Sequence, residues 1–151
     1  MGTRGSKFID KVNVFVDGCS KGNRGPAGIG GIIVDANDDT KLDDFSEYIG
    51  VKTNNEAEYM AILKGLSAAL SQTRKSVYMF SDSEFAIRQI NKSYRIKEGR
   101  MEPLCLKVVQ KAQLFERVQF SHVSSSNPRI RRADMLAKQA VERALFRPLK
   151  K

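Results

Sequence analysis

Four acidic residues stand where the apolar pattern of the sequence predicts strand ends or helix starts, rather than on ordinary exposed faces. They are Asp17, Glu58, Asp82 and Asp134. Asp17 and Asp82 each follow an apolar run typical of a strand, so their carboxylates lie side by side if those strands are parallel neighbours. Such a pair repels unless a cation holds it, and Mg²⁺ binds through a few carboxylates together with water and phosphate oxygens. The acids therefore predict a divalent metal site that leaves room for a phosphate.

Each acid also has a purely structural interpretation. Glu58 follows Asn55 at the spacing of a helix capping box, and the same spacing relates Glu56 to Thr53. Asp134 is expected in the first turn of its helix, where the macrodipole favours any acid. The two strand-end aspartates are also common turn or cap residues. Taken singly, each acid favours the structural interpretation, whereas all four together in a basic chain favour the metal site.

The hydrophobic pattern places these acids on a mixed α/β domain. Alternating or continuous apolar runs predict strands, and apolar residues at three- and four-residue spacing predict amphipathic helices. The strands are expected at 11–16, 28–35, 43–49, 76–80 and 118–123, and the helices at 55–70, 83–90, 104–115 and 132–145. Three strands in a meander, followed by alternation of strands and helices, predict a mixed sheet with helices on both faces.

Length and composition indicate one globular domain with a basic surface. The chain has 151 residues, 26 Lys and Arg against 17 Asp and Glu, and a formal net charge of +9. The domain is expected over 7–147, with flexible tails at 1–6 and 148–151. No apolar run is long enough to cross a bilayer, and the widely separated Cys19 and Cys105 fit a reduced compartment, so a cytoplasmic protein is expected. A chain this basic is attracted to a polyanion, nucleic acid first and an acidic membrane surface second.

The four acids lie in segments that resemble the successive motifs of type 1 ribonuclease H. The segments are the glycine-rich 17–28, Thr53-Asn54-Asn55 with Glu58, Ser81-Asp82-Ser83, and Ala133-Asp134. They occur in the right order on the right expected elements and cover nearly the whole chain. The resemblance implies a ribonuclease H-like fold, with a five-stranded mixed sheet of three antiparallel and two parallel strands flanked by helices. It also implies Mg²⁺-dependent cleavage of the RNA strand of RNA/DNA hybrids.

Carried over position by position, the resemblance makes all four acids metal ligands and catalytic residues. It implies endonucleolytic hydrolysis with two Mg²⁺ ions, or Mn²⁺ in their place, which leaves 5′-phosphate and 3′-hydroxyl ends. His122 is the fifth catalytic residue on this basis, as an aid to proton transfer or product release. It is followed by a polar segment that leads to Asp134 and is longer than the resemblance implies.

The resemblance also implies how the substrate is held. A hybrid differs from duplex DNA in its 2′-hydroxyls, which both donate and accept hydrogen bonds. The expected contacts to the nucleic acid are Gly18, Asn23, Thr53, Asn54, Asn55 and Ser83, with Thr53 at a DNA phosphate. Asn54 and Asn55 have the alternative role of capping the helix, and the two roles are compatible. The expected partner is an RNA/DNA hybrid, bound by a monomer without a membrane or an obligate protein partner.

Two other kinds of function stay open at this point. One is a module that binds a hybrid or duplex without cutting it, and the intact set of four acids argues against this. The other is a related nuclease or strand-transfer enzyme, such as an integrase, a resolvase or the ribonuclease H portion of a reverse transcriptase. The glycine-rich first turn and the Thr53-Asn54-Asn55 segment favour the hybrid-specific branch, because amide groups there can read 2′-hydroxyls.

Overall fold

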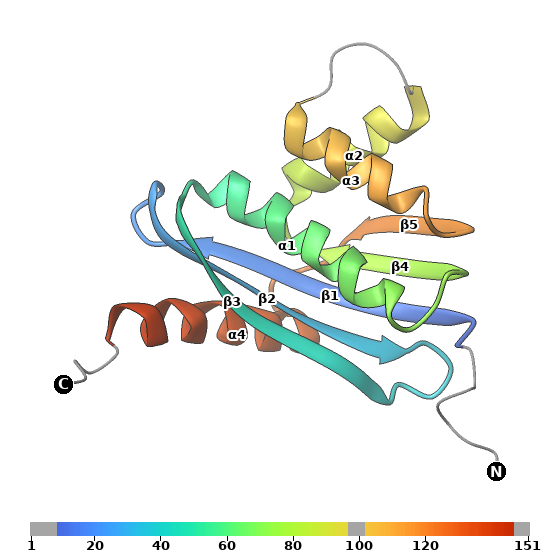
Figure 1. Cartoon of the computed structure of the whole chain (residues 1–151), viewed down its shortest axis with the longest axis horizontal. Helices are drawn as coiled ribbons and strands as arrows, with labels where there is room; N and C mark the ends of the chain where they lie inside the picture. The colour runs from blue at the N-terminus through green and yellow to red at the C-terminus, as the bar shows by residue number, and fades with distance from the viewer. Residues whose placement is uncertain (1–8, 97–101, 147–151) are drawn as a thin grey trace.

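The computed structural model describes residues 9–96 and 102–146, and the tails expected at 1–6 and 148–151 lie outside this part of the chain. Figure 1 shows the strands and helices in the predicted order, β-β-β-α-β-α-α-β-α. Their bounds are β1 Lys11–Ser20, β2 Gly25–Asp35, β3 Lys41–Lys52, α1 Asn54–Leu70, β4 Ser76–Ser81, α2 Glu84–Ile96, α3 Pro103–Ala112, β5 Arg117–His122 and α4 Pro128–Leu145.

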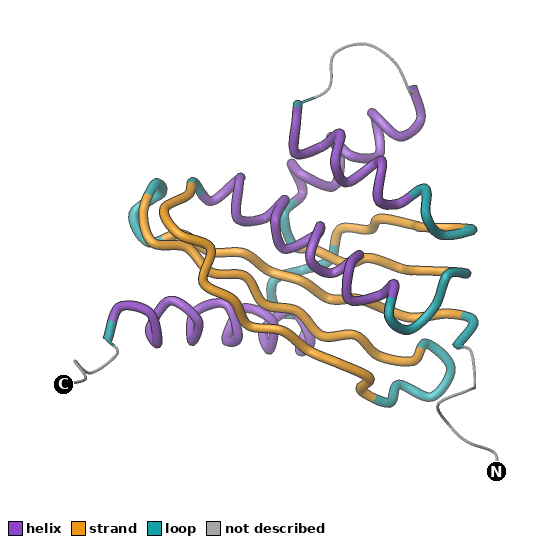
Figure 2. Tube along the Cα trace, in the orientation of Figure 1, coloured by secondary structure: helices purple, strands orange, loops and turns teal. Residues whose placement is uncertain are grey.

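One mixed sheet carries all five strands, in the order β3-β2-β1-β4-β5. The pairs β1/β2 and β2/β3 are antiparallel, and the pairs β1/β4 and β4/β5 are parallel. Figure 2 shows the long meander of β1, β2 and β3 beside the two shorter strands β4 and β5. The predicted fold, three antiparallel strands extended by two parallel ones, is therefore confirmed.

Helices cover both faces of the sheet, as predicted, with α1 in front of it and α4 behind it in Figure 1. Successive side chains of a strand point to opposite faces, and β1 shows the consequence. Val12, Val14 and Val16 pack into the core shared with α1, α2 and α3, whereas Phe15 packs into a smaller core with Ile130 of α4. Within the described residues, no helix combines the length and the apolar character that a membrane span requires.

The strands extend beyond the apolar segments that predicted them. The prediction that Asp17 ends the first strand is wrong, because β1 continues to Ser20 in pairing with β2. Backbone pairing with a neighbouring strand holds these residues extended even where their side chains are small or polar. The parallel pairing of β1 with β4 stops earlier, at Phe15 and Phe80, so Asp17 still lies beyond the end of that ladder.

Three helix bounds differ from the prediction. The helix expected at 132–145 begins four residues earlier, at Pro128, because the Asn127 side chain accepts hydrogen bonds from the backbone N–H groups of Arg129 and Ile130. Asn followed by Pro is a typical start of a helix, and the sequence interpretation took it for loop. Asp134 therefore lies beyond the first turn of α4, which removes the macrodipole explanation for it. The helix expected at 83–90 continues to Ile96, and the one expected at 104–115 ends at Ala112.

Candidate active site

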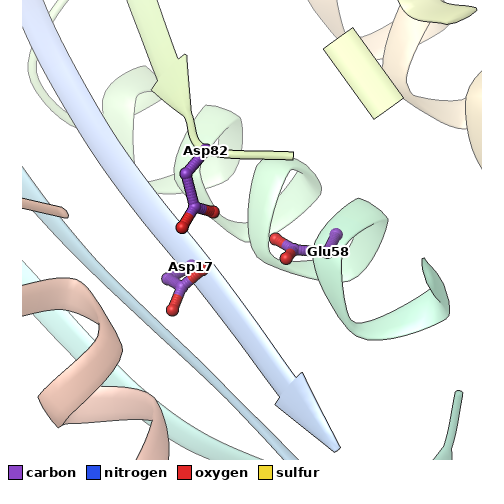
Figure 3. Close-up of side chains that lie close together, drawn as sticks. All are labelled: Asp17, Glu58 and Asp82. Carbon is purple, nitrogen blue, oxygen red and sulfur yellow. The ribbon is translucent and has the colours of Figure 1, made fainter. Parts of the chain in front are cut away.

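The register of β1 against β4 brings Asp17 and Asp82 together. Phe15 pairs with Phe80, and their rings stack with centroids 4.9 Å apart. Asp17 and Asp82 each follow two residues later, so both carboxylates lie just beyond the same end of the parallel ladder. Figure 3 shows them facing a shared space. The predicted side-by-side arrangement of these two acids is confirmed.

Gly18 allows α1 to deliver the third acid. A Cβ atom at this position would overlap the backbone carbonyl of Ala57, so α1 lies directly against the backbone of β1. Glu58 is the next residue of the helix, and its carboxylate reaches the two aspartates (Figure 3). One carboxylate oxygen from each of Asp17, Glu58 and Asp82 lies within 4.8 Å of the other two.

Gly30 allows a similarly close approach of a helix, α4, on the opposite face of the sheet. It is the direct partner of Asp17 across β1 and β2, and a Cβ atom on it would overlap the backbone carbonyl of Ala133 in α4. Asp134 follows Ala133 and lies close enough to Asp17 for a hydrogen bond between the two carboxyl groups. Asp134 thus borders the group of three acids, and its side chain also forms an ion pair with Lys138, at 3.0 Å from Oδ2 to Nζ.

The acids lie in surroundings that disfavour their ionised forms. Asp17 is only 5% exposed, and its pKa is raised first by burial and then by the neighbouring Glu58, Asp134 and Asp82. Burial and the Asp82 charge likewise raise the pKa of Glu58, although a hydrogen bond from the Gly18 backbone opposes this effect. A cation placed among these oxygens would reverse both effects, because it stabilises the carboxylate form.

One atom at this site has no partner. Oε1 of Glu58 is buried and accepts no hydrogen bond from any described residue. An unpaired buried carboxylate oxygen is costly, which makes a missing ligand the physical explanation. The donor set consists of carboxylate oxygens, and hard oxygen ligands suit Mg²⁺ or Mn²⁺ rather than the softer metals. The residues present therefore fit the divalent cation that the sequence predicts.

The capping alternative for Glu58 is resolved by Thr53 and Glu56. Thr53 is the N-cap of α1: its Oγ1 accepts from the backbone N–H of Glu56, and the Glu56 carboxylate accepts from the backbone N–H of Thr53. This reciprocal pair is the capping box of the helix. Glu56 therefore has the structural role, and Glu58 is free to face the aspartates. The alternative that Asn55 caps the helix is wrong, since the N-cap lies two residues earlier.

The asparagines expected to contact substrate tie the turn at 21–24 to the start of α1. Oδ1 of Asn54 accepts from the backbone N–H of Ser20 at 2.9 Å. The backbone N–H of Asn54 donates to Oδ1 of Asn23 at 2.7 Å, and Asn23 has a φ of 40° in this turn. The Asn55 side chain is exposed and makes no hydrogen bond to another described residue. These contacts fix the Asn23 and Asn54 side chains and do not involve Asn55.

Two further expected contacts have structural roles of their own. Ser83 precedes α2, and its Oγ accepts from the backbone N–H of Ala86 at 3.3 Å, which caps that helix. Gly18 is buried under α1, as described above. These roles neither require nor prevent contact with nucleic acid, so both assignments stay predictions.

His122 does not join the three acids. It is the last residue of β5, where it is exposed and pairs with Ser81, the residue before Asp82. β4 therefore separates it from Asp17 in the sheet. Its predicted part in proton transfer or product release stays a prediction.

Lys138 is the residue at this site that the sequence interpretation missed. It follows Asp134 by one helical turn, and the i,i+4 spacing of an acid and a lysine on a helix was a signal that could have found it. The sequence interpretation searched for acidic metal ligands, and a lysine is not one of them. Only the packing of α4 against β2 shows that the pair lies beside Asp17.

Comparison with known proteins agrees with this geometry. Residues 15–140 match the family described as reverse transcriptase-like. The bifunctional protein Rv2228c of Mycobacterium tuberculosis is 32% identical over 136 residues, which make up 89% of this chain and 36% of that protein. The chain thus spans about a third of the length of this relative. Ribonuclease H of Polaromonas sp. strain JS666 is 32% identical over 157 residues and is matched over 96% of its length, against 95% of this chain.

A solved structure extends the likeness to three dimensions. LC11-RNase H1, solved in complex with an RNA/DNA hybrid, superposes with a TM-score of 0.76 at 31% sequence identity. The match covers 89% of this chain and 99% of that one. The similarity in three dimensions therefore extends over most of the chain.

Proposed function

Because the chain belongs to the reverse transcriptase-like family, and within it to the ribonuclease H enzymes, we propose that it cleaves the RNA strand of RNA/DNA hybrids. The reaction is endonucleolytic hydrolysis that depends on two Mg²⁺ ions and leaves 5′-phosphate and 3′-hydroxyl ends. Mn²⁺ is the alternative metal. LC11-RNase H1, whose complex with such a hybrid has been solved, supports the choice of substrate.

The observation that carries the proposal is the unpartnered Oε1 of Glu58 within a group of three acids. Three carboxylates within 4.8 Å of one another repel strongly when all of them are ionised. The buried oxygen without a hydrogen bond indicates that this arrangement is completed by a ligand of positive charge.

Asp17, Glu58, Asp82 and Asp134 are the residues that would hold the metal ions. When bound, the ions lower the pKa of an attacking water and stabilise the leaving oxygen of the RNA strand. The four carboxylates are positioned by β1, by the residue that follows β4, and by the helices α1 and α4. Asp17 and Glu58 have raised pKa values without metal, so cation binding is expected to be accompanied by proton release.

The turn at 21–24 and the start of α1 would read the hybrid. Asn23 and Asn54 are held through their Oδ1 atoms, which leaves their side-chain NH2 groups without a partner in the described part of the chain. Such groups donate hydrogen bonds to 2′-hydroxyl or phosphate oxygens in the shallow groove of a hybrid. Asn55, Thr53, Ser83 and Gly18 complete the proposed contact surface. A monomer in the cytoplasm stays the prediction for the assembly and location of the protein.

The test is cleavage of a hybrid labelled on its RNA strand, with Mg²⁺ or with EDTA. Matched duplex RNA, duplex DNA and both single strands are assayed beside it, and the RNA ends are identified by phosphatase and ligase treatment. Asp82→Asn is the inactive variant and Asp43→Asn, an exposed acid of β3, is its charge-matched control. We expect hybrid-selective cutting that Asp82→Asn and EDTA abolish and Asp43→Asn leaves intact. Salt-sensitive binding without cutting in either metal would overturn the proposal in favour of a binding module.

A further inference from the structure

Lys138 is the one cation that forms an ion pair with any of the four site acids within residues 9–96 and 102–146. Its Nζ lies 3.0 Å from Oδ2 of Asp134, and Asp17 and Cys19 also lie within electrostatic range. We propose that Lys138 is an internal counter-cation at Asp134, which a divalent metal ion must displace, so that this lysine sets the metal affinity of the site. The inference rests on the proposed function, because it assumes that Asp134 is a metal ligand.

The geometry makes the lysine a direct competitor. The Lys138 ammonium lies at Oδ2 of Asp134, so its positive charge occupies one oxygen of this carboxylate and repels a second cation that approaches the same group. In the group of three acids beside it, no described residue provides a positive charge. Lys138 therefore offsets part of the negative charge of the site when metal is absent, and it does so at the edge of the site rather than at its centre.

The surroundings of Lys138 allow the displacement. Its side chain is 63% exposed, so the ion pair is screened by water and holds the lysine only weakly. Two shallow hollows of α4 include Lys138 in their walls, one of 310 Å³ with Cys19 and Lys21 and one of 580 Å³ with Arg131 and Arg132. A long flexible side chain can turn into either hollow without any shift of the backbone.

The experiment measures metal binding by the substrate-free protein, with Mg²⁺ and Mn²⁺ titrated calorimetrically at constant ionic strength. Lys138→Met removes the charge and keeps most of the side-chain length. Arg132→Met is the matched control, because it removes from the same helix a positive charge that pairs with no acid among the residues the structure describes. Lys138→Arg keeps the charge at the position itself.

We expect Lys138→Met to lower the dissociation constant about twofold to fivefold, the range set by an exposed ion pair. Arg132→Met and Lys138→Arg are expected to stay close to the wild type. In an Asp134→Asn background the effect of Lys138→Met should vanish, since the shared ligand is gone. Thermal melting of each apoprotein checks that the variants fold.

Each outcome decides between separate claims. Equal metal dissociation constants for Lys138→Met and Arg132→Met would overturn the proposed competition. Weaker metal binding by Lys138→Met than by the wild type would also overturn it, and would make the lysine a positioning residue for Asp134. Absence of metal binding by the wild type and by Lys138→Met alike would instead remove the metal site of the proposed function, and this inference with it.

Discussion

Asp17 of β1 and Gly30 of β2 are direct partners in the sheet, and the missing side chain of Gly30 lets α4 approach the Asp17 carboxylate. On the other side, Gly18 allows α1 to lie against β1 and bring Glu58 to the same carboxylate. Two glycines thus define how closely the two helices, and the acids that they carry, come to the sheet.

Gly30→Ala should reduce both stability and activity. The added Cβ overlaps the Ala133 carbonyl, a backbone atom that can move only with α4, so we expect a loss of about 1–3 kcal/mol in the free energy of unfolding. The shift of α4 also moves Asp134 away from Asp17. Asp134→Asn is the control, since it should lower cleavage with little loss in urea-unfolding midpoint. Wild-type cleavage by Gly30→Ala would show that the close approach of α4 is not needed.

Asp17→Asn should change how the stability of the metal-free protein depends on pH. Burial and neighbouring acids raise the pKa of Asp17 in the folded state, so the folded protein retains a proton that the unfolded chain loses. Stability is then highest below the ordinary pKa of an aspartate and falls as pH rises toward the folded pKa. Asp17→Asn removes the part of this decline that is due to Asp17, while Glu58 keeps its own part, and the variant should be more stable than the wild type at pH 8 by about 1–3 kcal/mol, the cost of an uncompensated buried group.

Thermal melting at pH 5 and pH 8, with EDTA or Mg²⁺, measures this effect. Mg²⁺ should raise the Tm of the wild type at pH 8 and that of Asp17→Asn much less. Glu116→Gln, an exposed acid without a side-chain partner among the described residues, serves as the control. Parallel pH profiles for the wild type and Asp17→Asn would contradict the raised pKa.

His122→Ala tests the remaining catalytic prediction. The side chain is exposed at the end of β5, beside β4, which Asp82 follows directly, so its loss should leave the fold and hybrid binding intact. We expect a lower kcat with little change in the dissociation constant of the hybrid, because a proton carrier acts only during turnover. A kcat equal to that of the wild type would identify His122 as an ordinary exposed histidine.

Asn127→Ala should destabilise α4 at its start. Asn127 accepts two backbone hydrogen bonds there, and the loss of an asparagine N-cap costs about 1 kcal/mol. Ser125→Ala, two residues earlier and without a side-chain hydrogen bond among the described residues, is the control in chemical unfolding. Equal unfolding midpoints for the two variants would mean that Pro128 alone starts the helix.

The identities of the acids, the order of the elements and the mixed sheet were readable from the sequence by itself. Strand and helix periodicity is local, and an acid that follows an apolar strand is marked by its neighbours in the chain. The capping box is equally local, although the sequence left open whether Thr53 with Glu56 or Asn55 with Glu58 forms it.

Only the tertiary structure decided which of these residues are in contact and how they change each other's pKa values. The unpartnered oxygen of Glu58, the raised pKa of Asp17 and the ion pair of Lys138 with Asp134 arise where a strand end and two helices meet. The start of α4 at Pro128 also moved Asp134 out of the first turn and ended its simplest structural explanation. Periodicity describes each segment alone, whereas the distance between carboxylates far apart in sequence depends on how closely the helices pack on the sheet, which the side chains of both surfaces determine together.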